Sequence, residues 1–213
     1  METGGHVTTM EAGWGGGVSP FGATWQKTMM WIFIVTDALL FSGLLCGYAF
    51  LRQAGAAPWP DRTQVFSIAF IALMTFILIT SSMTMGTAVT AARLGDRKTA
   101  MANLAFTIVG GAAFLSCQAY EWTHLIREGA RLTGALPGSE LVEKGVTPQF
   151  SQAFFVLTGF HGSHVFSGLV ILVITLIRTR MGKTPAQGVE MAGLYWHFVD
   201  LVWVFIFTLF YLI

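Results

Sequence analysis

A small set of ionisable side chains lies inside the long apolar stretches of this chain. The set comprises Asp37, Glu121, His161, His164, His197 and Asp200. A charged residue at the centre of a membrane costs roughly 2.5–3.5 kcal/mol on insertion scales, so such a residue needs a partner or a task. Carboxylates and imidazoles at that depth can hold helices together, pass protons or ligate a metal, and each role predicts different neighbours.

Helical spacing favours structural roles for four of these side chains. His197 and Asp200 are three residues apart, so they share one helix face and can satisfy each other. We interpret them as a structural pair that fixes the last apolar segment. His161 and His164 have the same spacing, and a buried histidine usually bonds a carbonyl or hydroxyl group.

Metal or haem ligation is the alternative to these structural roles. Haem needs two axial ligands at matched depth on facing helices, and only His164 and His197 meet this condition. The sequence has no CxxCH motif, and copper or iron clusters would need more converging Cys or His ligands. Cys46 and Cys117 fall inside apolar segments, which is typical of small core residues. We expect no metal and no cofactor in this chain, and a haem-bearing membrane anchor is the alternative.

The composition is that of a membrane protein. Hydrophobic residues make up 54% of the chain, charged residues make up 11%, and the mean hydropathy is +0.64. A soluble domain carries about 25% charged residues. The excess of apolar surface must therefore face lipid. The net charge of +1 argues against nucleic-acid binding.

The predicted fold class is all-α, a polytopic membrane protein built as a bundle of five transmembrane helices. The predicted spans are residues 27–51, 66–92, 101–126, 150–177 and 193–213, each near the ~20 residues that cross a bilayer. Residues 1–26 are Gly-rich and polar, and we expect a flexible tail there rather than a signal peptide. Residues 27–213 form a single domain in this interpretation, without an internal repeat.

Basic residues between the spans predict the orientation. The second and fourth linkers are short and dense in positive charge, and short loops count most. We therefore place the N-terminus in the cytoplasm and the C-terminus outside. The cytoplasmic side would carry Lys27, Arg93, Arg97, Lys98, Arg178, Arg180 and Lys183, and the other side Arg52, Arg62, Arg127, Arg131 and Lys144.

Two of the ionisable residues are predicted near the bilayer midplane. At ~1.5 Å per residue, Asp37 lies about 15 Å into its span and His161 lies about 16 Å in from the opposite side. Both depths fall near the middle of a core about 30 Å thick. Asp37 has no partner on its own helix face. We expect its carboxyl to be protonated or held by a hydrogen bond from another helix, with His161 as the candidate.

Small residues indicate how the helices pack. In the fourth span Gly159, Ser163 and Ser167 recur every four residues, a pattern that lets helix backbones approach closely. The second span is rich in hydroxyl groups over residues 80–87, and these can bond their own helix or a neighbour. We assign both features to packing.

Several long motifs resemble subunit III of haem–copper terminal oxidases. The family's two late helices resemble residues 154–168 (FFVLTGFHGSHVFSG) and 194–212 (LYWHFVDLVWVFIFTLFYL). Its helix with an intramembrane acid, commonly Glu, resembles residues 29–43 (MMWIFIVTDALLFSG), where the acid is Asp37. Its Gln-Ala-x-Glu segment resembles SCQAYEWTHLI, which places Gln118 and Glu121. The likeness covers nearly all five spans in order.

The resemblance implies a subunit without haem or copper, whose partner subunits carry both. It implies packing beside oxidase subunits I and II in a bacterial inner membrane, with a larger respiratory supercomplex as a further candidate partner. It also implies bound phospholipid and support of proton uptake and turnover durability. Many members have seven spans, and this chain resembles the short five-helix bacterial form. The two missing helices bound the family's lipid cleft, so we expect helices of a neighbouring subunit to replace them.

We assign the chain to a cytochrome c oxidase, with ubiquinol oxidase as the alternative. This alternative stays open because the contacts with the electron donor lie on other subunits. The chain has no redox ligand set, nucleotide motif or nucleophile constellation, so we do not expect it to reduce oxygen alone. A transporter would usually show inverted repeats and helices broken near the midplane, and the sequence shows neither. We assign no catalytic residue and treat the ionisable set as candidates for helix or lipid contacts.

Overall fold

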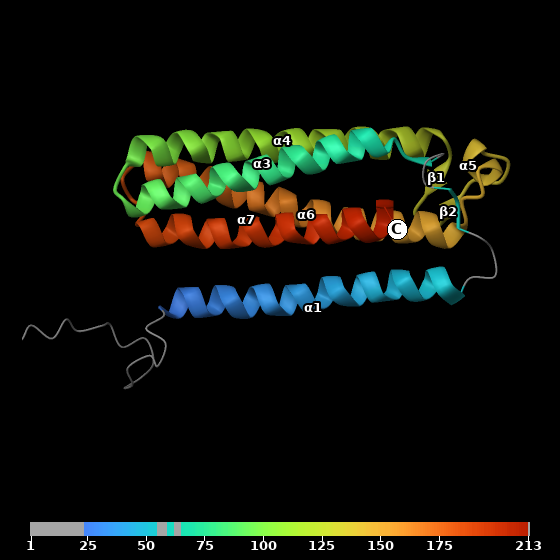
Figure 1. Cartoon of the computed structure of the whole chain (residues 1–213), viewed down its shortest axis with the longest axis horizontal. Coiled ribbons are helices and arrows are strands. Elements are labelled where there is room, and N and C mark those ends of the chain that lie inside the picture. Colours follow the sequence, from blue (N-terminus) through green and yellow to red (C-terminus); the bar gives the residue numbers. More distant parts are fainter. Residues whose placement is uncertain (1–23, 55–58, 62–64, 213) are drawn as a thin grey trace, which may run out of the picture.

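The chain forms five long helices, which a computed structural model describes over residues 24–54, 59–61 and 65–212 (Figure 1). They are α1 (Trp25–Ala54), α3 (Ile68–Arg93), α4 (Arg97–Arg127), α6 (Pro148–Arg180) and α7 (Ala186–Ile206), and α7 continues as the π-helical η1 (Phe207–Leu212). Each is long and apolar enough to cross a membrane. The predicted all-α fold with five membrane-length helices is confirmed. Residues 1–23 of the expected tail lie outside the described part of the chain, and α1 begins at Trp25.

The last helix starts earlier than the sequence pattern predicted. The expected span began at residue 193, whereas α7 begins at Ala186, directly after Pro185 at the N-cap position. The polar side chains of Gln187 and Glu190 lower the hydropathy of this first turn, which hid it from an apolar pattern. Proline is tolerated at a helix start because the first backbone N–H groups have no partner within the helix.

α7 lies inside the bundle and α1 lies at its edge (Figure 1). α3 packs along α4, α7 packs on both α3 and α6, and α1 contacts mainly α7 and α6. α1 buries only Asp37, Phe41 and Tyr48. Most of its surface is therefore left for lipid or for a partner protein.

Glycines on α4 set the closest approaches between elements. A Cβ atom on Gly110 would lie 2.7 Å from the Cβ of Ser81, so these two positions bring α3 and α4 together. A Cβ atom on Gly111 would lie 2.4 Å from the indole of Trp196, which is fully buried. The ring of Trp196 also touches Gly168, and it thus fills the space between α4 and α6.

The small-residue stripe on α6 receives aromatic side chains instead of a helix backbone. Trp122 packs over Gly159, at 3.1 Å from a Cβ built there. The Ser167 hydroxyl lies 2.7 Å from the Tyr195 hydroxyl, and Ser163 is exposed. The stripe therefore packs against rings of α4 and α7 at Gly159 and Ser167, in keeping with its assignment to packing.

The two ends of the bundle differ in their linkers. The end that we call the short-loop end holds the start of α1 and the linkers 94–96 and 181–185. There Arg97, at the start of α4, donates to the carbonyls of Thr179 (2.6 Å) and Arg180 at the end of α6. The opposite long-loop end carries an antiparallel pair, β1 (Ala130–Arg131) and β2 (Gly134–Ala135), and the short helix α5 (Glu140–Glu143) (Figure 1).

Candidate functional site

Asp37 links α1 to α6 at the middle of the bundle. Its Oδ1 lies 3.3 Å from Nε2 of His164, and both side chains are largely buried. The structure places this carboxyl against another helix, but its neighbour there is His164, and the expected partner, His161, was wrong. His164 lies one helical turn further along α6, and the rotation of α6 about its axis turns this histidine toward α1.

The contacts of His164 orient its ring between α6 and α1. Nδ1 of His164 lies 2.8 Å from the carbonyl oxygen of Phe160. A carbonyl oxygen can only accept, so Nδ1 carries a hydrogen. Nε2 is then the ring nitrogen that faces Oδ1 of Asp37, and this contact joins α6 to α1.

His161 occupies an aromatic enclosure at the core. It is fully buried, and within the described ranges neither of its ring nitrogens has a hydrogen-bond partner. Trp203 lies 5.1 Å away and Phe114 5.9 Å away between ring centroids, and Phe114 meets it edge-on. The carbonyl or hydroxyl partner that the sequence pattern favoured is not found among the described residues. The aromatic rings hold this imidazole by packing.

Glu121 joins α4 to the π-helical end of the chain. Gln118 Nε2 donates to Glu121 Oε2 at 2.9 Å, and the Tyr211 hydroxyl donates to the same oxygen at 3.1 Å. Glu121 Oε1 has no partner among the described residues. Sequence reasoning missed Tyr211, because the widened turns of η1 shift its register in a way that an α-helical pattern does not contain.

The polar partner of His197 lies on α3 and is not Asp200. The Ser82 hydroxyl lies 2.6 Å from Nδ1 of His197, whereas Oδ1 of Asp200 is buried and has no hydrogen-bond partner among the described residues. In the described part of the chain no ion pair joins His197 to Asp200, so the expected direct pair was wrong. The hydroxyl-rich face of α3 supplied a signal for Ser82, since a hydroxyl can bond a polar side chain on a facing helix.

The outward face of α7 also differs from the expected one. His197 is exposed, Val204 is 37% exposed, and Val202 is buried at 5%. A structural pair that fixes this helix would point into the bundle, and for His197 that interpretation was wrong, whereas Asp200 is buried. The inward face is lined by bulky rings and branched chains, namely Trp196, Val199, Trp203, Ile206 and Phe210. These large side chains fill the interior better than the polar ones do.

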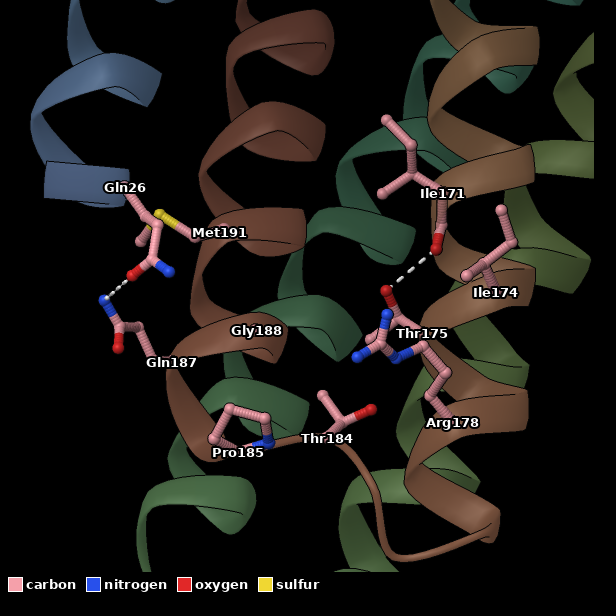
Figure 2. Close-up of a pocket in the computed structure, with 10 residues that line it drawn as sticks. All are labelled: Gln26, Ile171, Ile174, Thr175, Arg178, Thr184, Pro185, Gln187, Gly188 and Met191. Carbon is pink, nitrogen blue, oxygen red and sulfur yellow. Dashed lines mark hydrogen bonds between the residues drawn. The ribbon is translucent and has the colours of Figure 1, made fainter.

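A pocket of about 340 Å³ opens at the short-loop end between α6 and α7 (Figure 2). Arg178 and Thr175 line it from α6, Gln187 and Met191 line it from α7, and Gln26 reaches it from α1. Gln187 donates to the side chain of Gln26 at 3.2 Å. The pocket therefore combines an apolar wall with one cation and several amide and hydroxyl groups.

Glu190 fastens the short-loop end of three helices. Its Oε1 accepts from Lys27 Nζ on α1 at 2.7 Å and pairs with a guanidinium nitrogen of Arg93 on α3 at 2.9 Å. Sequence reasoning missed Glu190, since it lies in the turn that was excluded from the predicted span. Lys27 and Arg93, the cations that pair with Glu190, were used only to predict the orientation of the chain in the membrane.

The ionisable set does not converge on one centre. Within the described ranges no group of three or more His, Cys, Asp or Glu side chains could hold a metal ion. The two histidines that matched in depth each have another neighbour: His164 faces Asp37, and His197 faces Ser82. The arrangement is a set of separate interhelical contacts, each of which joins two or three helices.

The fold and these contacts define a multi-pass membrane bundle whose interior polar groups join helices. The family model "Cytochrome c oxidase subunit III" matches residues 7–213. The chain therefore belongs to the family of subunit III of haem–copper oxidases, multi-pass membrane subunits of bacterial respiratory oxidases, a family known to lack redox cofactors.

Relatives of two kinds are similar to this chain. Quinol oxidase subunit 3 of Bacillus subtilis is 37% identical over 187 residues, 85% of this chain and 84% of that protein. Probable cytochrome c oxidase subunit 3 of Nocardia farcinica is 33% identical over 185 residues, 85% of each chain. Cytochrome bo(3) ubiquinol oxidase subunit 3 of Pseudomonas putida is 34% identical over 195 residues, 88% of this chain and 86% of that protein.

Proposed function

We propose that this chain packs against the catalytic subunit of a haem–copper oxidase and binds phospholipid. It supports proton uptake by the catalytic subunit and prolongs the number of turnovers before that subunit is inactivated. Its partners are oxidase subunits I and II, which carry the haem and copper, and membrane phospholipids. The location is the bacterial inner membrane with the short-loop end in the cytoplasm, where seven basic residues of the sequence gather. A larger respiratory supercomplex is a further partner in this proposal.

The pocket at Arg178 carries the phospholipid part of the proposal. A guanidinium group binds phosphate oxygens through paired N–H donors, and Arg178 stands in the last turn of α6, where headgroups lie. Ile171 and Ile174 continue the same wall toward the membrane interior and suit an acyl chain (Figure 2). Thr184 and Gln187 offer further polar groups beside the phosphate.

The exposed polar face of α7 supports docking to another membrane protein. His197 is exposed well inside a helix of membrane-spanning length. Lipid chains cannot hydrogen-bond an imidazole, so a partner helix with polar side chains is the better cover. The large exposed surface of α1 has room for the neighbouring helices that the seven-helix members carry within their own chain.

Both kinds of relative have similar identity to this chain, so they support a role common to cytochrome c and quinol oxidases. We propose cytochrome c as the donor first and quinol second. The neighbouring reading frames test this choice. A subunit II with the ligand residues of a copper centre would support cytochrome c, and a subunit II without them would support quinol.

The phospholipid role is tested by replacing Arg178 with glutamine in the assembled oxidase. Arg180→Gln is the matched control, because it removes the same charge from the same last turn but does not line the pocket. We expect Arg178→Gln to lower the phospholipid that co-purifies with the complex and to shorten the number of turnovers before inactivation. Equal lipid content and equal lifetime in both variants would contradict the proposal.

A further inference from the structure

A second cavity lies at the long-loop end, where α3 begins and α4 ends, and the proposed function does not use it. Its volume is about 280 Å³. Glu121 on α4 is the acid in its lining, and three aromatic rings accompany it. The full lining is Val65, Phe66, Ser67, Phe70, Ile71, Tyr120, Glu121, His124 and Leu125.

The carboxylate of Glu121 has an acceptor oxygen available for a positively charged hydrogen-bond donor. The residue is 6% exposed, and both hydrogen bonds from Gln118 and Tyr211 go to Oε2. Oε1 is buried and has no hydrogen-bond partner among the described residues. A buried oxygen of this kind costs free energy unless a donor reaches it, and the cavity is the space from which a donor can come.

The rings around Glu121 suit an organic cation. Phe66, Phe70 and Tyr120 line the same cavity, and the Phe70 and Tyr120 rings meet edge-on with centroids 5.8 Å apart. Ring faces attract cations, and aromatic cages bind ammonium groups in this way. Tyr120 is 64% exposed, so it forms the mouth of the cavity toward the membrane side.

The depth of Glu121 fits a lipid headgroup. It stands six residues before Arg127 at the end of α4, about 9 Å along the helix axis. α4 has 31 residues, so at ~1.5 Å per residue it extends roughly 8 Å beyond a 30 Å hydrocarbon core at each end. Glu121 therefore lies close to the boundary between hydrocarbon and headgroups.

We propose that this cavity binds the primary ammonium group of a phosphatidylethanolamine headgroup on the carboxylate of Glu121. The ammonium donates to Oε1 and packs against the rings of Phe70 and Tyr120. Ser67, whose hydroxyl makes no cap hydrogen bond, faces the phosphate at the same opening, and His124, which pairs with Glu128 at 3.5 Å, lines the opening beside it. The site requires that the chain lies in a bilayer, and it does not depend on the Arg178 pocket.

The test counts lipids on the intact oxidase by native mass spectrometry after equilibration with phosphatidylethanolamine or with phosphatidylglycerol, which has no ammonium group. Glu121→Gln removes the charge and keeps an oxygen for Tyr211, and Tyr120→Leu removes a ring and leaves Glu121 intact. Phe106→Leu is the control, since it removes a 66% exposed ring elsewhere on α4. Subunit content and oxidase activity are measured in parallel, so that loss of the subunit is distinguished from loss of the lipid.

We expect Glu121→Gln and Tyr120→Leu to reduce retained phosphatidylethanolamine several-fold at one site, with no change for Phe106→Leu or for phosphatidylglycerol. Equal retention of phosphatidylethanolamine by the wild type and both cavity variants would overturn the proposal. Saturation of the site by soluble ethanolamine in lipid-free detergent, with no gain from added phosphatidylethanolamine, would overturn the lipid as the source of the ammonium group.

Discussion

Asp37 and His164 form a polar contact between two helices that otherwise meet mainly through apolar side chains. This contact sets the rotation of α1 relative to α6. The described chain offers no continuous relay from this pair to either membrane surface, because His161 one turn away has no hydrogen-bond partner among the described residues. We therefore assign the pair to interhelical binding.

Replacing Asp37 by asparagine should leave oxidase turnover and proton pumping nearly intact. The amide can still donate to Nε2 of His164 and occupies the same space, whereas Asp37→Leu leaves that nitrogen without a partner. We expect Asp37→Leu to weaken packing and to shorten the number of turnovers before inactivation. Proton-to-electron ratios in reconstituted vesicles provide the measurement. Loss of pumping by Asp37→Asn in a fully assembled enzyme would show that the carboxyl carries protons.

Asp200 is predicted to support assembly as a buried polar side chain of α7. It is 9% exposed, so Asp200→Ala leaves a cavity at the helix interface, while Asp200→Asn keeps the shape and an acceptor oxygen. We expect Asp200→Ala to reduce the amount of this subunit that co-purifies with the catalytic subunit, and Asp200→Asn to retain it. Val109→Ala on α4 is the control, because this valine is 65% exposed and lies outside the α7 face that we propose for docking. Equal co-purification of all three variants would refute the role.

At the scale of elements, Trp196 holds α4, α6 and α3 around α7. Its indole Nε1 donates to the Ser81 hydroxyl of α3 at 3.2 Å, and its ring lies against Gly111 and Gly168. Each helix therefore contributes one small residue to a single large ring. Such packing leaves little space for an added methyl group.

Gly111→Ala should destabilise the bundle by about 1–3 kcal/mol, the usual cost of overpacking a filled interior. The added carbon would lie 2.4 Å from a buried indole that has no room to move. Gly162→Ala on α6 is the matched control, because nothing lies within 4 Å of its Cβ position. Thermal unfolding of the purified complex compares the two variants. A melting temperature for Gly111→Ala at or above that of Gly162→Ala would contradict this packing.

The stability of the first turn of α4 should depend on pH, because the carboxylate of Asp96 caps this turn. Hydrogen bonds from the Thr99 hydroxyl and then its backbone N–H lower the pKa of Asp96 below the ordinary value of 3.8. The stabilisation is therefore present above the ordinary pKa and is lost as the pH falls through the lowered one. Hydrogen exchange of the amides of residues 97–100 should accelerate between about pH 5 and about pH 2 beyond its intrinsic change. Asp96→Asn, which caps without titrating, should not show this acceleration.

Hydropathy predicted the five helices because span length is imposed by the bilayer and needs no knowledge of neighbours. It did not predict which histidine faces Asp37, nor that Val202 is buried, because the helices are apolar around their whole circumference. Their rotation is set by shape, as with Trp196 against Gly111. The β1–β2 pair and α5 depend on local turns and gave no periodic signal.

At the scale of the whole molecule, α1 is the most weakly attached helix. Its contacts with the rest include the Glu190 pair with Lys27, the Asp37 contact with His164, and the ring of Tyr48 against that of Phe210. Such contacts keep α1 beside α7 at the edge of the bundle (Figure 1) while leaving most of its surface open. This surface is where helices of a neighbouring subunit fit in our proposal.

This chain is expected to prolong turnover in a partner that carries the redox chemistry. The direct measurement is continuous oxygen consumption by the purified oxidase with the chain present, removed, and added back. We expect similar initial rates, a several-fold shorter active lifetime without the chain, and recovery of the lifetime when the chain is added back. An enzyme that lacks the chain completely and still keeps the full lifetime would contradict this role.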